Sequence, residues 1–406
     1  MGNILNLIYD DINVTQVFLK DYMESYLSIS NYKLVHIDDI ESVKDENSIY
    51  LYFHFDYLIN QINLFGGLPL SEDVIQKMHQ YPKLYVVFLN DSESDTDDAI
   101  RLVDIEIKRN NLNSNRFYIS NWNQSLHESK ERHNSEINVH IFNRGDHIMA
   151  GNFIRHGCDF VEDKEFLFMN LNRNIKNHRF LFLCFLKKYN ILDDTDWSWL
   201  RGFEMKVDAF KSQHGELLPD WYYFQIFDKS QIDNLKPEIE YIRSVDIKKS
   251  KLEQDVQIDF PPYHLDWEKM WELNPYKNSY INIVGETNYL NENVVVICEK
   301  TYTPLYFCQI PIFLASPGHV KKIKELYGFD LFDDLINHDY DNEPDHGKRM
   351  LMVLDEVKKL HSNKEQVIEF YKNNKERLLS NKNKFYELKN RVQLDVDFFN
   401  GIANKI

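Results

Sequence analysis

The sequence contains no long apolar run. Nowhere in its 406 residues does it approach the ~20 consecutive apolar residues that span a bilayer. No basic segment precedes the apolar residues at the amino terminus, so residues 1–11 indicate a first strand and not a signal peptide. We therefore expect no membrane span and a cytoplasmic location, which would be the host cytoplasm for a viral protein.

Basic residues are also scarce. The chain has 47 Lys and Arg against 64 Asp and Glu, a formal net charge of −17. A nonspecific nucleic-acid binder needs a basic footprint, which this balance argues against. A narrow basic groove would escape such a count, so a nucleic-acid acceptor is disfavoured and not excluded.

Cysteine is the third scarce class. The four cysteines lie in apolar settings without metal-ligand spacing: Cys158, Cys184, Cys298 and Cys308. They are typical of reduced core residues in a cytosolic protein, and we expect neither a metal site nor a cofactor. The 43% hydrophobic content and the length fit a globular chain of two domains, each with its own core.

The first half alternates apolar runs with helical patterns, which predicts a parallel, Rossmann-like sheet. We expect strands at residues 3–9, 32–37, 48–55, 84–89, 117–120 and 138–142. We expect helices at residues 14–27, 71–79 and 97–110.

The strand at residues 84–89 is followed by an acidic segment. Such a cluster either caps the next helix or supplies an active-site carboxylate, and capping is the commoner case. If it is catalytic, Glu93 is our first choice and Asp91 our second for a general base that takes a proton from an attacking hydroxyl. The alternative is that Asp95 and Asp97 form a metal-binding pair.

A linker or crossover is predicted around residues 146–163, and a second set of polar residues follows the apolar run at residues 166–169. Asn172 and Arg173 come directly after this strand, and His178 and Arg179 open a helix predicted to reach residue 189. Two guanidinium groups there can converge on a diphosphate through charge-assisted bonds. The plain alternatives are a surface ion pair for Arg179 and a helix cap for His178.

Residues 280–328 have the form of a parallel-sheet unit. An apolar run at residues 280–284 ends in Gly285 and Glu286, Glu299 and Lys300 begin a helix at about residues 301–307, and a second run covers residues 310–314. Open α/β sheets place ligands at such strand ends, and charges at helix starts suit a phosphate and a sugar. The alternative is that both glutamates cap helices and Lys300 is a surface ion-pair partner.

Three segments together resemble the fucosyltransferase-like glycosyltransferases of GT-B fold. The first is Glu286 with Val-Ile-Cys-Glu299-Lys300 and Gln-Ile-Pro311-Ile-Phe, which is similar to their donor-binding motif. Residues 326–334 and the Asn-x-Asn-Arg173, His178-Arg179 order resemble uncharacterised phage and bacterial members. Cys298 stands where the fucosyltransferases carry Thr, so a sugar contact made by that hydroxyl would be absent.

The resemblance implies an α/β, GT-B fold with two Rossmann-like domains facing across a cleft and carboxyl-terminal helices. The domains would be an acceptor domain at residues 1–150, a donor domain at 151–362 and a helical segment at 363–406. The sequence pattern itself indicates an aromatic, irregular stretch from residue 197 to about 271, interpreted as an insertion around residues 200–270, with a helix-like stretch at 229–252. The segment at 337–349 would be a loop, followed by helices at 350–360 and 364–392.

The implied function is transfer of a sugar from a nucleotide-sugar donor to a hydroxyl of a glycan acceptor, inverting and metal-independent. Arg173, Lys300 and Arg179 would hold the diphosphate, with Asn172 and His178 beside it, and Glu286 and Glu299 would bind ribose or sugar hydroxyls. Two other functions stay open from the sequence. They are a noncatalytic glycan- or nucleotide-binding protein of the same fold and a phage-type enzyme that glycosylates modified DNA bases.

Overall fold

The structure is a computed structural model of the chain. It describes residues 5–9, 32–43, 49–55, 70–90, 96–121, 123–141, 159–172, 176–199, 225–245 and 276–403. Within these ranges no helix is both long and apolar enough to cross a membrane. The chain divides into two compact units: unit 1 is Met1–His147 with Glu387–Ile406, and unit 2 is Ile148–Tyr386.

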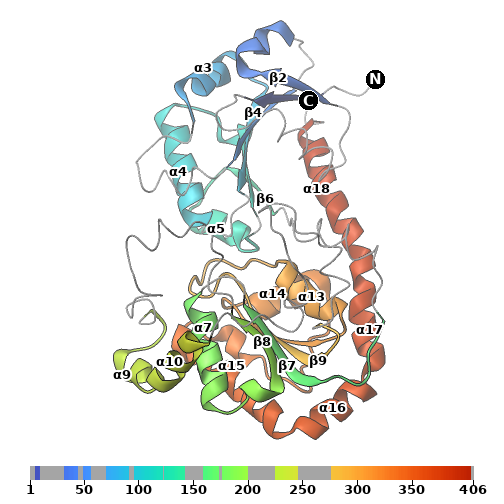
Figure 1. Ribbon diagram of the computed structural model, residues 1–406. Helices are drawn as coiled ribbons and strands as arrows, with labels where there is room; N and C mark the ends of the chain where they lie inside the picture. Colours follow the sequence, from blue (N-terminus) through green and yellow to red (C-terminus); the bar gives the residue numbers. More distant parts are fainter. Residues whose placement is uncertain are drawn as a thin grey trace. The chain divides into compact units, whose positions relative to one another are not determined.

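Unit 1 contains a six-stranded sheet in which all neighbouring strands are parallel (Figure 1). In sheet order the strands are β2 (Tyr32–His36), β1 (Leu5–Tyr9), β3 (Ile49–Phe55), β4 (Leu84–Asn90), β5 (Phe117–Asn121) and β6 (Asn138–Ile141). The run Leu-Tyr-Val-Val-Phe-Leu of β4 is almost continuously apolar, as expected for a central parallel strand covered on both faces.

The helices that follow β3, β4 and β5 lie on one face of this sheet. They are α3 (Glu72–Gln80), α4 (Thr96–Arg109) and α5 (Leu126–Arg132). All three crossovers step across the sheet in the same direction, and right-handed crossovers then place their helices on the same side. One apolar core joins these helices to the sheet and includes Val74, Ile100, Leu126, Phe88 and Ile119.

Helix α18 (Leu388–Ala403) covers the opposite face. Because side chains alternate along a strand, Tyr118 and His140 point away from the core that takes Phe117 and Ile119. The Phe398 ring stacks on His140 at 3.8 Å and meets Tyr118 edge-on at 5.7 Å. His140 Nε2 also lies 2.6 Å from Asp395 Oδ1.

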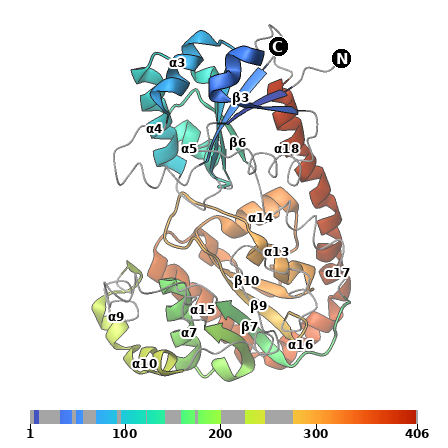
Figure 2. The same ribbon diagram turned by 45° about the horizontal axis from the view of Figure 1, so that its top comes forward.

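Unit 2 contains a four-stranded parallel sheet in the order β10 (Ile310–Leu314), β9 (Ser279–Gly285), β7 (Phe166–Asn172) and β8 (Thr195–Trp199). Helices α7 (Asn177–Lys188) and α15 (His346–Ser362) share one face, and α13 (Glu299–Tyr306) lies on the other, next to α17 (Lys375–Lys384) (Figures 1 and 2). Helix α7 is apolar on all sides because it is enclosed by the sheet, α10 and α15.

The remaining elements of unit 2 are short or peripheral. They are η5 (Leu192–Asp194), α9 (Lys229–Asp233), α10 (Lys236–Ser244), α14 (His319–Tyr327), η7 (Asp339–Asn342) and α16 (Lys364–Asn373); η8 (Phe385–Glu387) precedes α18. Unit 1 also has η2 (Ile37–Val43) and η3 (Ser114–Arg116). The predicted class, α/β with two Rossmann-like parallel sheets and carboxyl-terminal helices, is confirmed.

The predicted strands of the first half are confirmed, as are α3, α4, α7, β9, α13 and β10. The helix predicted at residues 14–27 and the crossover at 146–158 lie outside the described residues.

Four predictions were wrong, and two helices were not predicted. The stretch from Trp197, expected to be irregular, contains the end of β8, whose polar residues alternate with tryptophans. The helix expected at 229–252 breaks at Asn234 because Pro237 cannot continue a helix and instead starts α10. The helix α15 begins at His346 and not at residue 350. The region 364–392, predicted as one helix, divides at Asn374 and Phe385. The helices α5 and α14 were not predicted.

Candidate functional site

The sheet of unit 2 has a topological switch point between β7 and β9. From β7 the chain crosses to β8, and from β9 it crosses the opposite way to β10. The two crossover helices, α7 and α13, therefore leave the neighbouring strands toward opposite faces (Figures 1 and 2). Open α/β sheets bind ligands beyond the carboxyl ends of the strands at such a point. The topology thus favours a site at the ends of β7 and β9.

The predicted donor-site residues meet at this point wherever the structure describes them. Asn172 ends β7, and Glu286 follows the end of β9. His178 and Arg179 lie in the first turn of α7, and Lys300 lies in the first turn of α13. Glu299 opens α13, while its side chain, like Arg173, Glu93 and Asp91, lies outside the described residues.

The Glu286 carboxylate is 2% exposed and is held by residues of α13 and its cap. The Thr301 hydroxyl donates to Oε1 at 2.5 Å, and the Cys298 thiol donates to Oε2 at 3.0 Å. A buried carboxylate needs such donors, and two helix N-termini lie close to it. Glu286 is therefore fixed in orientation before any ligand binds.

His319, the first residue of α14, extends this network. Its Nε2 lies 3.0 Å from Thr301 Oγ1 and 3.9 Å from Glu286 Oε1. Thr301 has only one hydroxyl hydrogen and gives it to Glu286, so it accepts from a protonated Nε2 of His319. Burial lowers the pKa of His319 although the charge of Glu286 opposes this shift. The ring is therefore neutral, with its proton on Nε2.

His178 connects α7 to the end of β9. Its Nε2 lies 2.8 Å from the main-chain oxygen of Glu286, and its ring stacks on Tyr289 with 4.8 Å between centroids. Burial, with a smaller contribution from the charge of Arg179, holds the pKa of His178 well below its usual value. His178 thus acts as a neutral donor to the main chain and not as a cation.

Arg179 is almost fully buried beside Gly285. A Cβ added to Gly285 would lie 3.0 Å from Arg179 Cγ and 3.3 Å from its Nε. The missing side chain of Gly285 therefore leaves the space through which the Arg179 stem passes at the end of β9. This close approach brings a guanidinium to the switch point.

A ladder of amides crosses from β9 to the end of β7. The Asn170 side chain donates to the Ile283 oxygen at 2.7 Å, and the Asn172 side chain donates to Asn170 Oδ1 at 2.6 Å. Among the described residues, none donates to Asn172 Oδ1, which is buried. A buried polar oxygen usually has a hydrogen-bond partner, so Asn172 Oδ1 has acceptor capacity to spare at the end of β7.

Lys300 approaches the same network from the surface side of α13. Its Nζ lies 3.5 Å from Cys298 Sγ, and its side chain is half-buried. Cys298 is fully buried and directs its thiol to Glu286. The position thus supports Glu286 from inside the protein.

Four further residues at the candidate site were not predicted from the sequence: Tyr289, Thr301, His319 and Arg349. Each reaches the site through a contact between segments far apart in the chain, such as Arg349 with the oxygen of Tyr289 at 2.5 Å. No short motif encodes such contacts. Among the described residues, no group of three or more His, Cys, Asp or Glu side chains could hold a metal ion.

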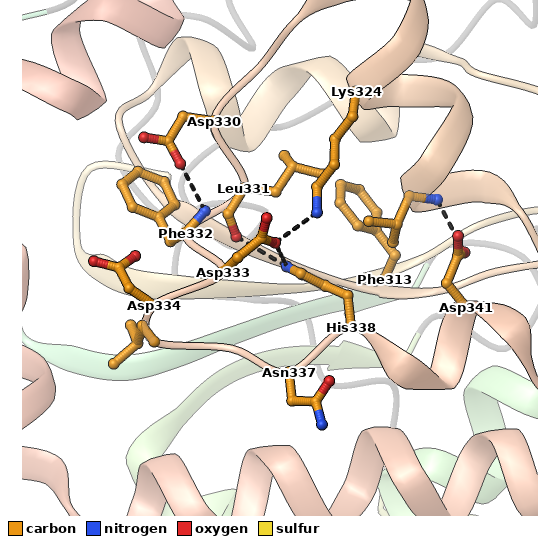
Figure 3. A network of polar contacts seen from close by, with 12 residues as sticks. Phe313, Lys324, Asp330, Leu331, Phe332, Asp333, Asp334, Asn337, His338 and Asp341 are labelled. Carbon is orange, nitrogen blue, oxygen red and sulfur yellow. Dashed lines mark hydrogen bonds and ion pairs between the residues drawn. The ribbon is translucent and has the colours of Figure 1, made fainter.

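A second polar region of unit 2 surrounds a cavity of about 490 Å³ between α14 and η7. In Figure 3, Lys324, Asp333 and His338 point toward one another, and Asp341 points to the start of α14. His338 bonds the Leu331 oxygen and the Tyr340 hydroxyl, each at 2.9 Å, and Asp341 accepts from Val320 N and Lys321 N. These bonds hold the segment before α15 against α14.

No protein-family model matches the chain, and a search of curated proteins gives no match. Several solved structures are similar to it, including the following two. One is an α,α-trehalose-phosphate synthase (UDP-forming) from Burkholderia vietnamiensis, at 10% identity and a TM-score of 0.45, covering 97% of this chain and 79% of that one. The other is an α,α-trehalose 6-phosphate synthase from Burkholderia multivorans, at 10% identity and 0.43, covering 96% and 77%.

Proposed function

We propose that the chain is a glycosyltransferase of GT-B fold and that the switch point of unit 2 binds its nucleotide-sugar donor. The observation that carries the proposal is the convergence of Arg179, Lys300, Glu286 and Asn172 on the ends of β7 and β9. The two cations and two helix N-termini suit a diphosphate, and the amide and carboxylate oxygens suit hydroxyls. The motif resemblance of residues 286–313 supports the same assignment.

Each residue has a distinct role in this proposal. Arg173, Arg179 and Lys300 neutralise the diphosphate, which stabilises the departing nucleotide without a metal. Glu286 and Glu299 accept bonds from ribose or sugar hydroxyls. A carboxylate has about four acceptor sites, so Glu286 keeps capacity beyond Thr301 and Cys298. His178 holds the main chain of Glu286 in place.

Unit 1 supplies the acceptor side in this proposal. Glu93, or else Asp91, removes the proton from the attacking hydroxyl of a glycan acceptor, so transfer is direct and inverts the sugar carbon. In the sequence both residues come shortly after the end of β4, and open α/β sheets place ligands beyond the carboxyl ends of their strands.

Donor binding is tested with Lys300→Ala. A thermal-shift screen of UDP-, GDP-, CMP- and dTDP-sugars first identifies the donor, which stabilises the native state by mass action. Calorimetric titration should then show affinity about 10- to 100-fold weaker in the variant, the value of one charge-assisted hydrogen bond. Transfer is checked by release of the nucleoside phosphate product, which Glu93→Gln with Asp91→Asn should abolish.

The matched control is Lys358→Ala, because Lys358 pairs with Asp355 on the exposed side of α15. Its donor affinity should equal that of the wild type. Equal affinity in wild type and Lys300→Ala for every donor would reject the site. Binding without any transfer would instead favour a noncatalytic protein.

A further inference from the structure

Arg349 is a buried cation in unit 2. It lies in the first turn of α15 and is 1% exposed. Within the described residues no carboxylate lies at ion-pair distance from its guanidinium. Burial lowers its pKa, while Tyr289 and the carboxylates of Glu292, Asp341 and Asp345 act at longer range to raise it. A charge in this environment is costly unless hydrogen bonds compensate it.

The compensation comes mainly from main-chain carbonyls of three separate segments. Arg349 Nη2 donates to the main-chain oxygen of Tyr289, in the loop after β9, at 2.5 Å. Its Nε donates to the main-chain oxygen of Ala315, in the loop after β10, at 3.1 Å. Nη1 donates to the oxygens of Glu343 and Pro344, before α15, at 2.6 and 3.1 Å. A fifth bond joins Nη2 to His346 Nδ1 at 3.2 Å. One planar side chain thus contacts both the loop after β9 (residues 286–297) and the loop after β10 (residues 315–318).

The Tyr289 ring links this guanidinium to His178. The Arg349 guanidinium lies over the ring at 4.5 Å, and His178 stacks on it at 4.8 Å. The Tyr289 hydroxyl donates to the His346 oxygen at 2.5 Å. His178 bonds the main-chain oxygen of Glu286, and Tyr289 is held by Arg349 and His346. The segment 286–289 is therefore held at both its ends.

The two loops are also bonded to each other. Ser316 N donates to the Asn288 oxygen at 3.1 Å, and Ser316 Oγ donates to the Val294 oxygen at 2.6 Å. The segment from Val294 leads directly to Cys298 and α13, which hold the Glu286 carboxylate. A displacement of the segment after β10 would therefore be transmitted to the α13 N-terminus.

We propose that Arg349 is a positioning residue for the switch-point site: through main-chain carbonyls of the β9 and β10 loops it sets the positions of Glu286 and of the α13 N-terminus. This inference rests on the proposed donor site for its functional consequence. Lysine cannot substitute for Arg349. Its ammonium carries three N–H donors on a single nitrogen, whereas the planar guanidinium carries five on three nitrogens and can reach carbonyls of three separate segments.

The first arm of the test is hydrogen–deuterium exchange of the full chain without ligand. Arg349→Lys should accelerate exchange in residues 286–297 and 315–318, while the strands of unit 1 keep the wild-type rate. Unchanged exchange in both loops would overturn the inference whatever the site binds.

The second arm is calorimetric titration with UDP and with GDP. Arg349→Lys should weaken binding about tenfold, the equivalent of one displaced charged hydrogen bond, although the positive charge is kept. Wild-type affinity in Arg349→Lys would show that only charge matters and would overturn the inference. If the wild type binds neither nucleotide, the same titration is made with CMP and dTDP. Binding of none of the four rejects the donor proposal, and the exchange arm alone then decides the role of Arg349.

Arg377→Lys is the matched control. Arg377 also makes five hydrogen bonds within unit 2, to Asp330, Asp334 and Asn374, but its partners lie in the segment before η7 and at the N-cap of α17. It should accelerate exchange near residues 330–334 and leave UDP and GDP affinity unchanged. A general loss of stability would affect both variants alike and would contradict a positioning role.

Tyr289→Leu keeps the test decisive if Arg349→Lys does not fold. It removes the ring between Arg349 and His178 and leaves the guanidinium bonds to Ala315 and Glu343 in place. Exchange should then rise in residues 286–289 and donor affinity should fall, whereas wild-type values for both would overturn the inference.

Discussion

Gly285 and Arg179 show how a single missing side chain shapes the site. The Arg179 stem passes where a Cβ of residue 285 would stand, with contacts of 3.0 to 3.4 Å. The backbone of Gly285 is ordinary strand and does not need the left-handed region. Glycine is thus required here for space and not for conformation.

Gly285→Ala should therefore weaken donor binding without destabilising the protein. The new methyl group must displace Arg179 by a few tenths of an ångström, which misaligns its guanidinium with a diphosphate. Alanine also restricts the unfolded chain, which favours the native state by about 0.5–1 kcal/mol. We expect severalfold weaker affinity in calorimetry and an unchanged or higher melting temperature.

Gly401→Ala is the control for this experiment. It adds the same methyl group to α18, where nothing lies within 4 Å of the new atom. Donor affinity should stay at the wild-type value. If Gly285→Ala also keeps that value, Arg179 does not contact the donor.

His178 illustrates what residue types alone leave undecided. A histidine beside an arginine at a helix start fits either a cationic phosphate ligand or a satisfied helix-start residue. Its burial and its bond to the Glu286 oxygen select a neutral ring that orders the main chain. The sequence could name the residue but not its protonation state, since that depends on enclosure by Tyr289 and Arg179.

At the scale of elements, strands with continuous apolar runs were predictable. The runs of β4, β9 and β10 are each bounded by polar or turn residues. The switch point then follows from which strands are neighbours, and this order was not available from the sequence. The strand β8 was missed because Asp196 and Ser198 alternate with two tryptophans, so no apolar run marks it.

Helix α15 begins at an N-cap residue, Asp345, that was not predicted from the sequence. The Asp345 side chain accepts from Lys348 N at 2.7 Å, so the helix starts at His346, four residues before the predicted start. This first turn carries Arg349. The acidic segment at residues 337–349 is therefore only partly a loop, because Asp345 ends the loop and caps the helix.

Asp345→Ala should cost about 1 kcal/mol of the free energy of unfolding, because the Lys348 N–H loses its side-chain acceptor and the helix N-terminus loses a nearby negative charge. Urea denaturation measures this cost. Asp355→Ala on the same helix is the control, since Asp355 is exposed and pairs only with Lys358 in the described structure. It should change stability by no more than about 0.5 kcal/mol. Equal losses in the two variants would show that the cap contributes nothing beyond a surface charge.

At the scale of the whole molecule, each unit has its own sheet and its own core. The chain passes from unit 1 to unit 2 near residue 147 and returns near residue 387. The returning helix, α18, is an integral part of unit 1 because Phe398 and Asp395 pack on Tyr118 and His140. A substitution in α18 should therefore change the stability of β5 and β6. The residues of the proposed donor site belong to unit 2.

Phe398→Ala tests this division. The ring stacks on His140 and contacts Tyr118, so its loss should destabilise unit 1 by about 2 kcal/mol, less than the roughly 3–5 kcal/mol of a fully buried phenylalanine. Hydrogen exchange should accelerate in β5 and β6 and stay at the wild-type rate in β7, β9 and β10, because separate cores open separately. Leu394→Ala, at a side chain 60% exposed on the same helix, should leave both sets of strands unchanged. Equal acceleration in the two sheets would mean that the units open as one cooperative body, and the donor site would then share its stability with α18.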